Sequence, residues 1–99
     1  MLPKKTGIHA VVLEQIRSIA KQYDLNRVIL FGSRARGDFK ERSDIDLAAS
    51  GGNISAFSLA VDEETDTLLK YDVVDLDRPV DPALLDNIRK DGIMLYEKV

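Results

Sequence analysis

The sequence predicts one small α/β (α+β) domain over residues 1–99, with helices packed on one side of a mixed β-sheet. Segments with the apolar spacing of helices alternate with short runs typical of strands, in the order helix, strand, strand, helix, strand, helix, strand. A chain of 99 residues can bury one modest core. Its 44% hydrophobic and 31% charged residues are ordinary for a soluble globular protein, so a disordered or fibrous class is not favoured.

The first half of the chain contains one predicted helix and two predicted strands. Apolar residues recur every three or four positions over residues 8–23, which predicts an amphipathic helix. The β-branched and aromatic run at 27–31 is typical of a buried strand, which Gly32 ends. The polar segment 33–42 indicates a tight turn or a single helical turn. Alternating polar and apolar residues at 43–48 then predict the second strand.

The second half adds two helices and two strands. A weaker helical pattern covers residues 54–68, and the run at 71–76 is typical of a third strand. Asp81 followed by proline indicates a helix start, and Gly92 indicates its end. Residues 93–96 are expected to add an edge strand.

Charge and cysteine content limit the classes of function. A formal net charge of −3 and a pI near 5.1 argue against general nucleic-acid binding, which usually needs a basic face. Because the chain has no cysteine, hard cations held by carboxylates are the expected metals. No apolar run approaches the roughly 20 residues that span a bilayer, and the first five residues lack the apolar stretch of a secretory signal. We therefore expect no membrane partner and a cytoplasmic location.

Two aspartates in the second predicted strand are candidate metal ligands. Asp44 and Asp46 are two positions apart, so a strand places both side chains on one face, with Cα atoms about 6–7 Å apart. Two like charges side by side are unfavourable unless a cation lies between them, and Mg²⁺ suits an all-oxygen site. The alternative is that both are solvated acids on an outward face, and the pair alone does not decide between the two.

The turn after the first strand is a candidate phosphate site. Gly32 allows a close backbone approach, the following amides can donate to phosphate oxygens, and Ser33 adds a hydroxyl. A tight connection would use the same residues. The turn and the carboxylate pair, however, belong to the ends of consecutive strands, which is the arrangement that a metal–nucleotide site requires.

Together these two segments resemble the signature of the polymerase-β nucleotidyltransferase superfamily. That signature joins a glycine-serine turn, a short arginine-containing helical turn and a serine-aspartate-x-aspartate strand, here GSRARG at 32–37 and SDIDL at 43–47. The other predicted elements fit the superfamily over nearly the whole chain. The resemblance implies the nucleotidyltransferase fold and an enzyme that uses ATP as substrate and two Mg²⁺ ions.

The resemblance also implies a third carboxylate, and it favours Asp72, which precedes two aliphatic residues. Asp44 and Asp46 would bridge the two magnesium ions, while Asp72 would help to hold the ion that activates the acceptor hydroxyl. Asp75 would point to the opposite face of the strand. It stays open as an alternative, because a bulge could shift the register.

The resemblance assigns the nucleotide to the turn and its arginines. The Gly32-Ser33 turn would hold the β- and γ-phosphates, and Arg36 is a further candidate for binding the nucleotide. Arg34 and Arg36 have two equally supported interpretations. Each could clamp phosphate charge or pair with nearby Asp38 and Glu41.

Within the superfamily, a chain without an added domain is similar to the minimal nucleotidyltransferases, which pair with HEPN-domain toxins. This resemblance implies an antitoxin that forms a hetero-oligomer with a HEPN-type toxin and transfers AMP from Mg-ATP to a hydroxyl of that partner, with tyrosine expected. One alternative is an antitoxin or regulatory subunit that only binds. Another is the catalytic half of a small-molecule, aminoglycoside-like nucleotidyltransferase. Acceptor identity and nucleotide preference stay open.

Overall fold

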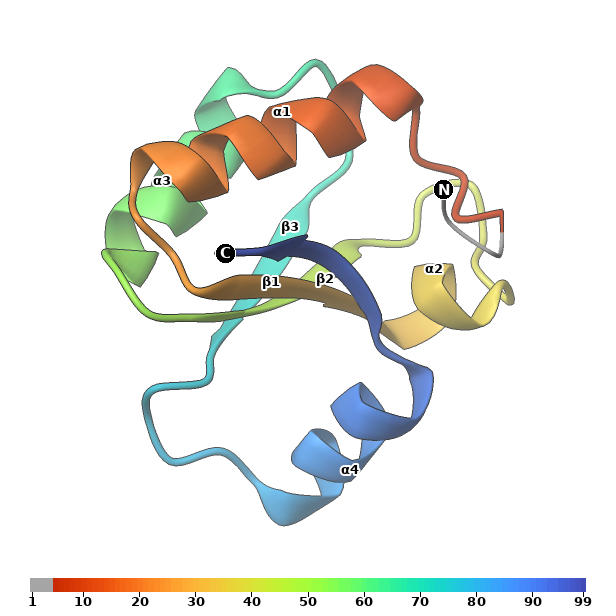
Figure 1. The fold of residues 1–99 in the computed structure, drawn as a ribbon. Coiled ribbons are helices and arrows are strands. Elements are labelled where there is room, and N and C mark those ends of the chain that lie inside the picture. The colour runs from red at the N-terminus through yellow and green to blue at the C-terminus, as the bar shows by residue number, and fades with distance from the viewer. Residues whose placement is uncertain (1–4) are drawn as a thin grey trace.

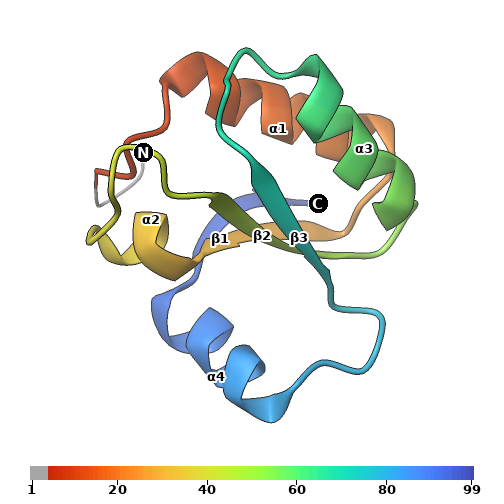
Figure 2. The same ribbon diagram turned by 180° about the vertical axis from the view of Figure 1, so that it is seen from behind.

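The computed structural model describes residues 5–99 as a mixed four-stranded sheet with four helices (Figures 1 and 2). The elements within this range are α1 Ala10–Gln22, β1 Arg27–Phe31, α2 Gly32–Arg36, β2 Ile45–Ser50, α3 Ile54–Glu64, β3 Tyr71–Asp75, α4 Pro82–Asp91 and β4 Ile93–Glu97. The predicted α+β class and order of the main elements are confirmed. None of the described helices is long and apolar enough to cross a bilayer. The expectation of no secretory signal rests largely on residues 1–4, which lie outside the described residues.

The sheet has the strand order β3-β2-β1-β4. Strand β1 pairs antiparallel with both β2 and β4, whereas β2 and β3 are parallel. A parallel pair needs a crossover connection, and α3 lies within it. Strand β2 therefore has a neighbouring strand on each side, so its residues contact segments from two other parts of the chain.

Helices α1 and α3 cover one face of the sheet (Figure 1). The core on this face includes Ile16 of α1 and Phe57 of α3, which pack with Leu30 and Leu47 of the central strands. All four side chains are fully buried. This face therefore contains most of the hydrophobic core.

Helix α4 covers the opposite face, so the prediction that all helices pack on one side is wrong (Figure 2). Ile88 of α4 packs with Phe31 and Ala48, which alternate along their strands with Leu30 and Leu47 of the first core. The central strands are thus apolar on both faces. The second apolar face must also be shielded from water, and α4 packs against it.

Several predicted boundaries differ from the observed ones. Strand β2 begins at Ile45, so Asp44 lies just before the strand and not within it. The cause is a turn, in which the Lys40 amide hydrogen-bonds to Oγ of Ser43 and the Ser43 amide to the Lys40 carbonyl. Helix α3 ends earlier than predicted, at Glu64. The cap at Asp81 is confirmed, because its carboxylate accepts from the Ala83 amide.

Candidate functional site

The site is built where β2 lies between β1 and β3. The register pairs Asp46 with Phe31 on one side and with Asp72 on the other. Paired residues on neighbouring strands project to the same face of a sheet. Since Phe31 packs against α4, Asp46 and Asp72 lie side by side on that face. Two residues that are distant in the sequence are thereby brought together.

Asp46 is held in an unfavourable environment for a charge. Burial is the largest cause that raises its pKa from 3.8 to about 6, and the charges of Asp72 and Asp44 raise it further. Arg36 and Arg34 oppose the shift without cancelling it. Burial and the neighbouring carboxylates therefore both disfavour the charged form of Asp46, which a bound cation would favour.

The donor set fits a hard cation. Asp44, Asp46 and Asp72 offer carboxylate oxygens, which Mg²⁺ prefers, and Asp72 is exposed and free to change rotamer. Across residues 5–99, no three acidic, histidine or cysteine side chains are already close enough together to hold a metal ion. The three aspartates would therefore have to close around an ion, and their role as ligands stays a prediction.

Gly32 brings the backbone against Asp46. Its φ is +75°, in the left-handed region, and a Cβ at this position would overlap Oδ2 of Asp46. Both constraints disfavour other residues. Helix α2 starts at Gly32, and the first N–H groups of a helix have no partner inside the helix. The turn can thus present donors to an anion beside the carboxylates, as the predicted phosphate role of Gly32 and Ser33 requires.

Arg34 has neither of its two predicted interactions. The side chain is 1% exposed, and its three nitrogens donate to backbone carbonyls of Thr6 (3.0 Å), Glu41 (3.1 Å) and Ser43 (2.9 Å). The guanidinium also lies over the ring of Phe39, 4.8 Å from the centroid. Burial lowers its pKa. Arg34 is therefore an anchor for the loop that leads into β2.

Arg36 takes part in ion pairs at the rim of the site. It donates to Asp38 at 3.2 Å, as one interpretation predicted, and lies 3.9 Å from Asp91 of α4. The hydrogen bond to Asp38 raises the pKa of Arg36. Arg36 is exposed, so these contacts leave the side chain free to exchange Asp38 for a phosphate, and its nucleotide role stays a prediction.

Asp75 lies away from the pair formed by Asp46 and Asp72. It faces the other side of β3, accepts a hydrogen bond from the Asp77 amide at 2.9 Å and pairs with Arg78 at 3.4 Å. No bulge interrupts the register between β2 and β3. The geometry therefore favours Asp72 over Asp75 as the third carboxylate.

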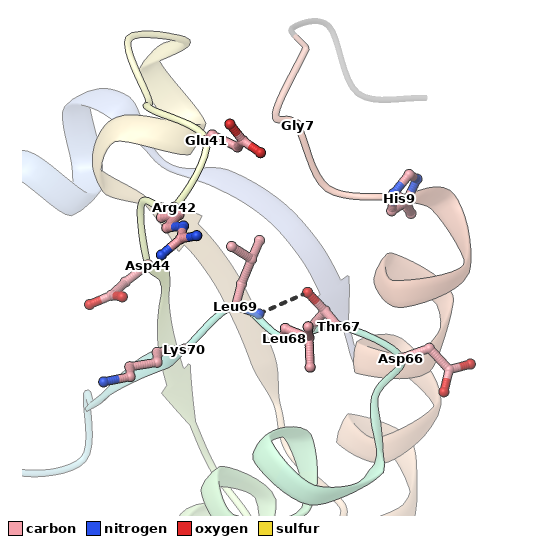
Figure 3. Close-up of a pocket in the computed structure, with 10 residues that line it drawn as sticks. All are labelled: Gly7, His9, Glu41, Arg42, Asp44, Asp66, Thr67, Leu68, Leu69 and Lys70. Atoms are coloured by element: carbon pink, nitrogen blue, oxygen red, sulfur yellow. Dashed lines mark hydrogen bonds between the residues drawn. The ribbon is translucent and has the colours of Figure 1, made fainter.

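Lys70 is a site residue that the sequence reasoning missed. The Ile45 amide donates to the Lys70 carbonyl at 2.8 Å, so the parallel register extends one residue and sets Lys70 beside Asp44. Figure 3 shows the charged ends of both side chains pointing to the same side. The signal was present in the sequence, because Lys70 stands two positions before Asp72 and strand periodicity puts both on one face.

A cavity of about 940 Å³ adjoins these residues (Figure 3). Its walls come from three segments far apart in the sequence, namely the strap at 7–9, the loop at 41–44 and the loop at 66–70. Asp44 lies in the wall of the cavity and also next to Asp46. Asp46 and Asp72 are not among the lining residues, and in Figure 3 the carboxylate of Asp44 points away from most of them.

The chain is similar to a known protein family and to a known protein. Residues 14–99 match the family described as "Polymerase beta, Nucleotidyltransferase". A stretch of 65 residues is 40% identical to the "Putative protein adenylyltransferase MJ0604" of Methanocaldococcus jannaschii and covers 64% of this chain. The match spans 63% of that relative, a little under two thirds of its length.

Solved structures with similar folds include three of note. A "putative minimal nucleotidyltransferase" is 28% identical with a TM-score of 0.63, over 82% of this chain and 86% of that one. A toxin-antitoxin crystallised with AMP-PNP is 25% identical with a TM-score of 0.63, over 87% and 73%. A mutant of the toxin-antitoxin MntA-HpeT has a TM-score of 0.68 over the same shares at 20% identity, which bears on the fold alone.

Proposed function

Because this chain belongs to the polymerase beta nucleotidyltransferase family, we propose that it is an enzyme that transfers AMP from Mg-ATP to a hydroxyl of a partner protein. The observation that carries the proposal is the pairing of Asp46 with Asp72 directly beside the Gly32 turn. Carboxylates for a metal and amide donors for phosphate meet there. If Asp46 and Asp72 served only as a general acid and a general base, the Gly32 turn beside them would have no role.

The proposed roles follow from position. Asp44, Asp46 and Asp72 would hold two Mg²⁺ ions, which when bound neutralise the triphosphate and favour ionisation of the acceptor hydroxyl. The Gly32-Ser33 turn would donate to the β- and γ-phosphates. The acceptor oxygen forms a bond to the α-phosphorus, the bond from that phosphorus to the bridging oxygen breaks, and pyrophosphate leaves.

The proposed acceptor is a tyrosine of a HEPN-type toxin, with this chain acting as the antitoxin of the pair in a hetero-oligomer. Similarity to a protein adenylyltransferase supports a protein acceptor. Similarity to a toxin-antitoxin crystallised with AMP-PNP supports ATP as donor and a toxin as partner. A cytoplasmic location, where ATP is available as the donor, is part of the proposal.

The test is AMP transfer to the protein encoded in the adjacent reading frame. Both purified chains are incubated with Mg²⁺ and α-labelled ATP, and the intact mass of each is measured. We expect a gain of one or more AMP groups on the neighbour, mapped by peptide sequencing to a tyrosine, and no gain with Asp46→Asn. A stable complex with unchanged masses would contradict the transferase and support an antitoxin that only binds.

A further inference from the structure

The sheet has two edge strands, and the fold protects one of them, β4. The register of β4 shifts between Val28 and Ile29 of β1, and Leu95 has no partner there. The Leu95 carbonyl instead accepts a hydrogen bond of 2.8 Å from Nε of Arg17 on α1. Bulges and charged side chains at an edge hinder pairing with another chain. The β4 edge is therefore poorly suited to accept a further strand.

Strand β3 forms the other edge, and its pairing with β2 is regular (Figure 2). The Ile45 amide donates to the Lys70 carbonyl, and the Leu76 amide donates to the Ala49 carbonyl, both at 2.8 Å. In a parallel pair, alternate residues of a strand turn their N–H and C=O groups toward the neighbouring strand. These two bonds therefore fix the direction of every residue in β3, with the even-numbered ones facing β2 and the odd-numbered ones facing away.

The backbone groups on the open side of β3 belong to Tyr71, Val73 and Asp75. The Asp75 carbonyl accepts from the Arg78 amide at 3.3 Å, which closes that end of the row. Within residues 5–99, no other backbone group of the row has a partner in the protein. Unpaired N–H and C=O groups at strand spacing are complementary to the backbone of another extended polypeptide. The edge itself therefore specifies what kind of group it can bind.

Both hydrophobic cores reach β3 and are only partly covered there. Val73 packs against the core under α1 and α3, Val74 packs against the core under α4, and both side chains are partly exposed. Next to Tyr71 lies a hollow of about 500 Å³ whose lining includes Leu59 of α3. Leu59 is 61% exposed. An apolar side chain on an added strand would shield Leu59 and Tyr71 from water.

The register connects this edge to the aspartates. A residue opposite Asp72 on an added strand would lie about 5 Å away and project to the same face as Asp72 and Asp46. Its two neighbours would project to the other face, toward Leu59. The Gly32 turn follows β1, so the proposed phosphate site, the aspartates and the added strand follow one another across the sheet. In-line transfer needs this order, because the acceptor oxygen and the leaving pyrophosphate lie on opposite sides of the α-phosphate.

We propose that an extended segment of the acceptor protein adds to the open edge of β3, with the modified hydroxyl residue opposite Asp72 and an apolar neighbour packed on Leu59. The inference rests on the proposed function, since it assigns the place of the acceptor in that transfer and adds no chemical step to it. The partner that fits is a polypeptide in which a hydroxyl residue stands next to an apolar one.

The first test is Val73→Pro, with the affinity measured for the protein encoded in the adjacent reading frame. The Val73 amide faces the open edge, so proline removes a donor from that edge and leaves the bonds between β3 and β2 in place. We expect the Kd for that protein to rise at least about tenfold, with AMP-PNP affinity in Mg²⁺ within about twofold of wild type. The matched control is Val73→Ala, which loses side-chain packing but keeps the amide, and it should weaken the complex much less. An unchanged Kd in folded Val73→Pro, or an equal rise in Val73→Ala, overturns the inference.

A second variant, Leu59→Asp, tests the apolar neighbour. Its matched control is Val11→Asp, because Val11 is also an exposed apolar residue of a helix but does not line the hollow. We expect Leu59→Asp to raise the KM for the same protein in AMP transfer about tenfold, the loss typical of one good interface contact, with kcat within about twofold. Val11→Asp should leave both values unchanged. Equal KM values in the two variants and the wild type would contradict the packing of the acceptor on Leu59.

Amide hydrogen exchange of the wild-type chain separates the inference from the transferase proposal. Without ATP, the adjacent-frame protein should slow exchange of the amides of Tyr71, Val73 and Asp75 at least about tenfold and leave β4 unchanged. Protection of β3 without AMP transfer would support the edge and contradict the transferase. Transfer without protection would support the enzyme and overturn the inference. Protection that appears in the chain alone as its concentration rises would make a second copy the occupant and also overturn it.

Discussion

The charged carboxylate of Asp46 destabilises the metal-free fold, although the same carboxylate is a proposed metal ligand. Its folded pKa of about 6 lies above its ordinary value of 3.8, so the folded protein keeps a proton that the unfolded chain releases. The associated stability is fully present below about pH 4 and is lost as the pH rises through 6. At neutral pH the carboxylate is charged, partly buried and repelled by Asp72 and Asp44. That state disfavours the metal-free protein and favours cation binding.

Asp46→Asn should therefore stabilise the metal-free protein while abolishing AMP transfer. We expect the free energy of unfolding at pH 8 to rise by about 1–2 kcal/mol, after allowance for solvent screening, and to change little at pH 4. Urea unfolding in metal-free buffer at both pH values measures this. Asp75→Asn, on the other face of the same sheet, is the control. A mutant that is less stable than wild type at pH 8 would refute the repulsion argument.

Gly32→Ala should destabilise the fold by about 1–3 kcal/mol and remove activity, because it adds backbone strain at positive φ and displaces the Asp46 carboxylate. Gly37→Ala is a matched control. Gly37 also has positive φ, but a Cβ added there would meet no atom within 4 Å, so only the strain remains. Thermal unfolding and AMP transfer are measured for both. Equal loss of activity in the two variants would mean that the contact with Asp46 is unimportant.

Helix α2 is an element that cannot be stable alone. It has five residues, fewer than a helix needs to form in isolation, and its position depends on Arg34 inside and on Arg36 with Asp91 outside. Arg34 also holds the loop that leads into β2. The element that carries the Gly32 turn and the segment that carries Asp44 are therefore anchored by one side chain.

Arg34→Met should cost about 2–4 kcal/mol of stability, because three backbone carbonyls lose a charged donor. Amide hydrogen exchange over residues 38–43 should rise more than exchange in α3. Arg36→Met, which removes only exposed ion pairs, should cost much less than Arg34→Met. Urea unfolding measures both variants. Similar losses of unfolding free energy in the two would contradict the role of Arg34 as an anchor of the loop.

Successive side chains of β3 point to opposite faces of the sheet, so Asp72 faces the site and Asp75 does not. Asp72→Asn should lower the rate of AMP transfer by at least about 100-fold, the size of effect seen when one charge-stabilising group is lost, and Asp75→Asn should leave it within about threefold. Single-turnover assays on folded variants measure both rates. An inactive Asp75→Asn beside an active Asp72→Asn would reverse the assignment of the third carboxylate.

At the scale of the whole molecule, the site exists only because the sheet joins three segments and leaves one part of its α4 face open. Helix α4 covers Phe31 and Ala48 but leaves Asp46 partly accessible. The Gly32 turn, the proposed phosphate site, lies against Asp46, a proposed metal ligand. A nucleotide and a metal should therefore bind together and stabilise the entire fold.

AMP-PNP with Mg²⁺ should raise the melting temperature far more than either one alone. Ligand at about 100 times its Kd adds about 2.7 kcal/mol to the folded state, and each kcal/mol shifts the melting temperature of a domain of this size by about 4–8 °C. Differential scanning calorimetry measures the shift. The shift should vanish in Asp46→Asn, and a shift that persists there would place the nucleotide elsewhere.

Local chemistry explains which features were predictable. Strand β1, the turn at Gly32 and the cap at Asp81 follow from short-range preferences of the residues themselves, and all are confirmed. Strand periodicity also put Asp72 and Asp75 on opposite faces of β3. The start of β2 was misplaced because Ser43 is recruited into a turn with Lys40. That turn competes with the strand, and alternation of polar and apolar residues cannot reveal it.

By itself, the sequence determined the element order, the acidic motif and the glycine turn, because each depends on neighbouring residues. Only the tertiary structure decided that α4 covers the second face, that Arg34 anchors the backbone and that Lys70 stands beside Asp44. It also decided that three segments far apart in the sequence together line a cavity. These features depend on register and on contacts between segments far apart in the chain, where the free energy of packing, not local propensity, selects the partner.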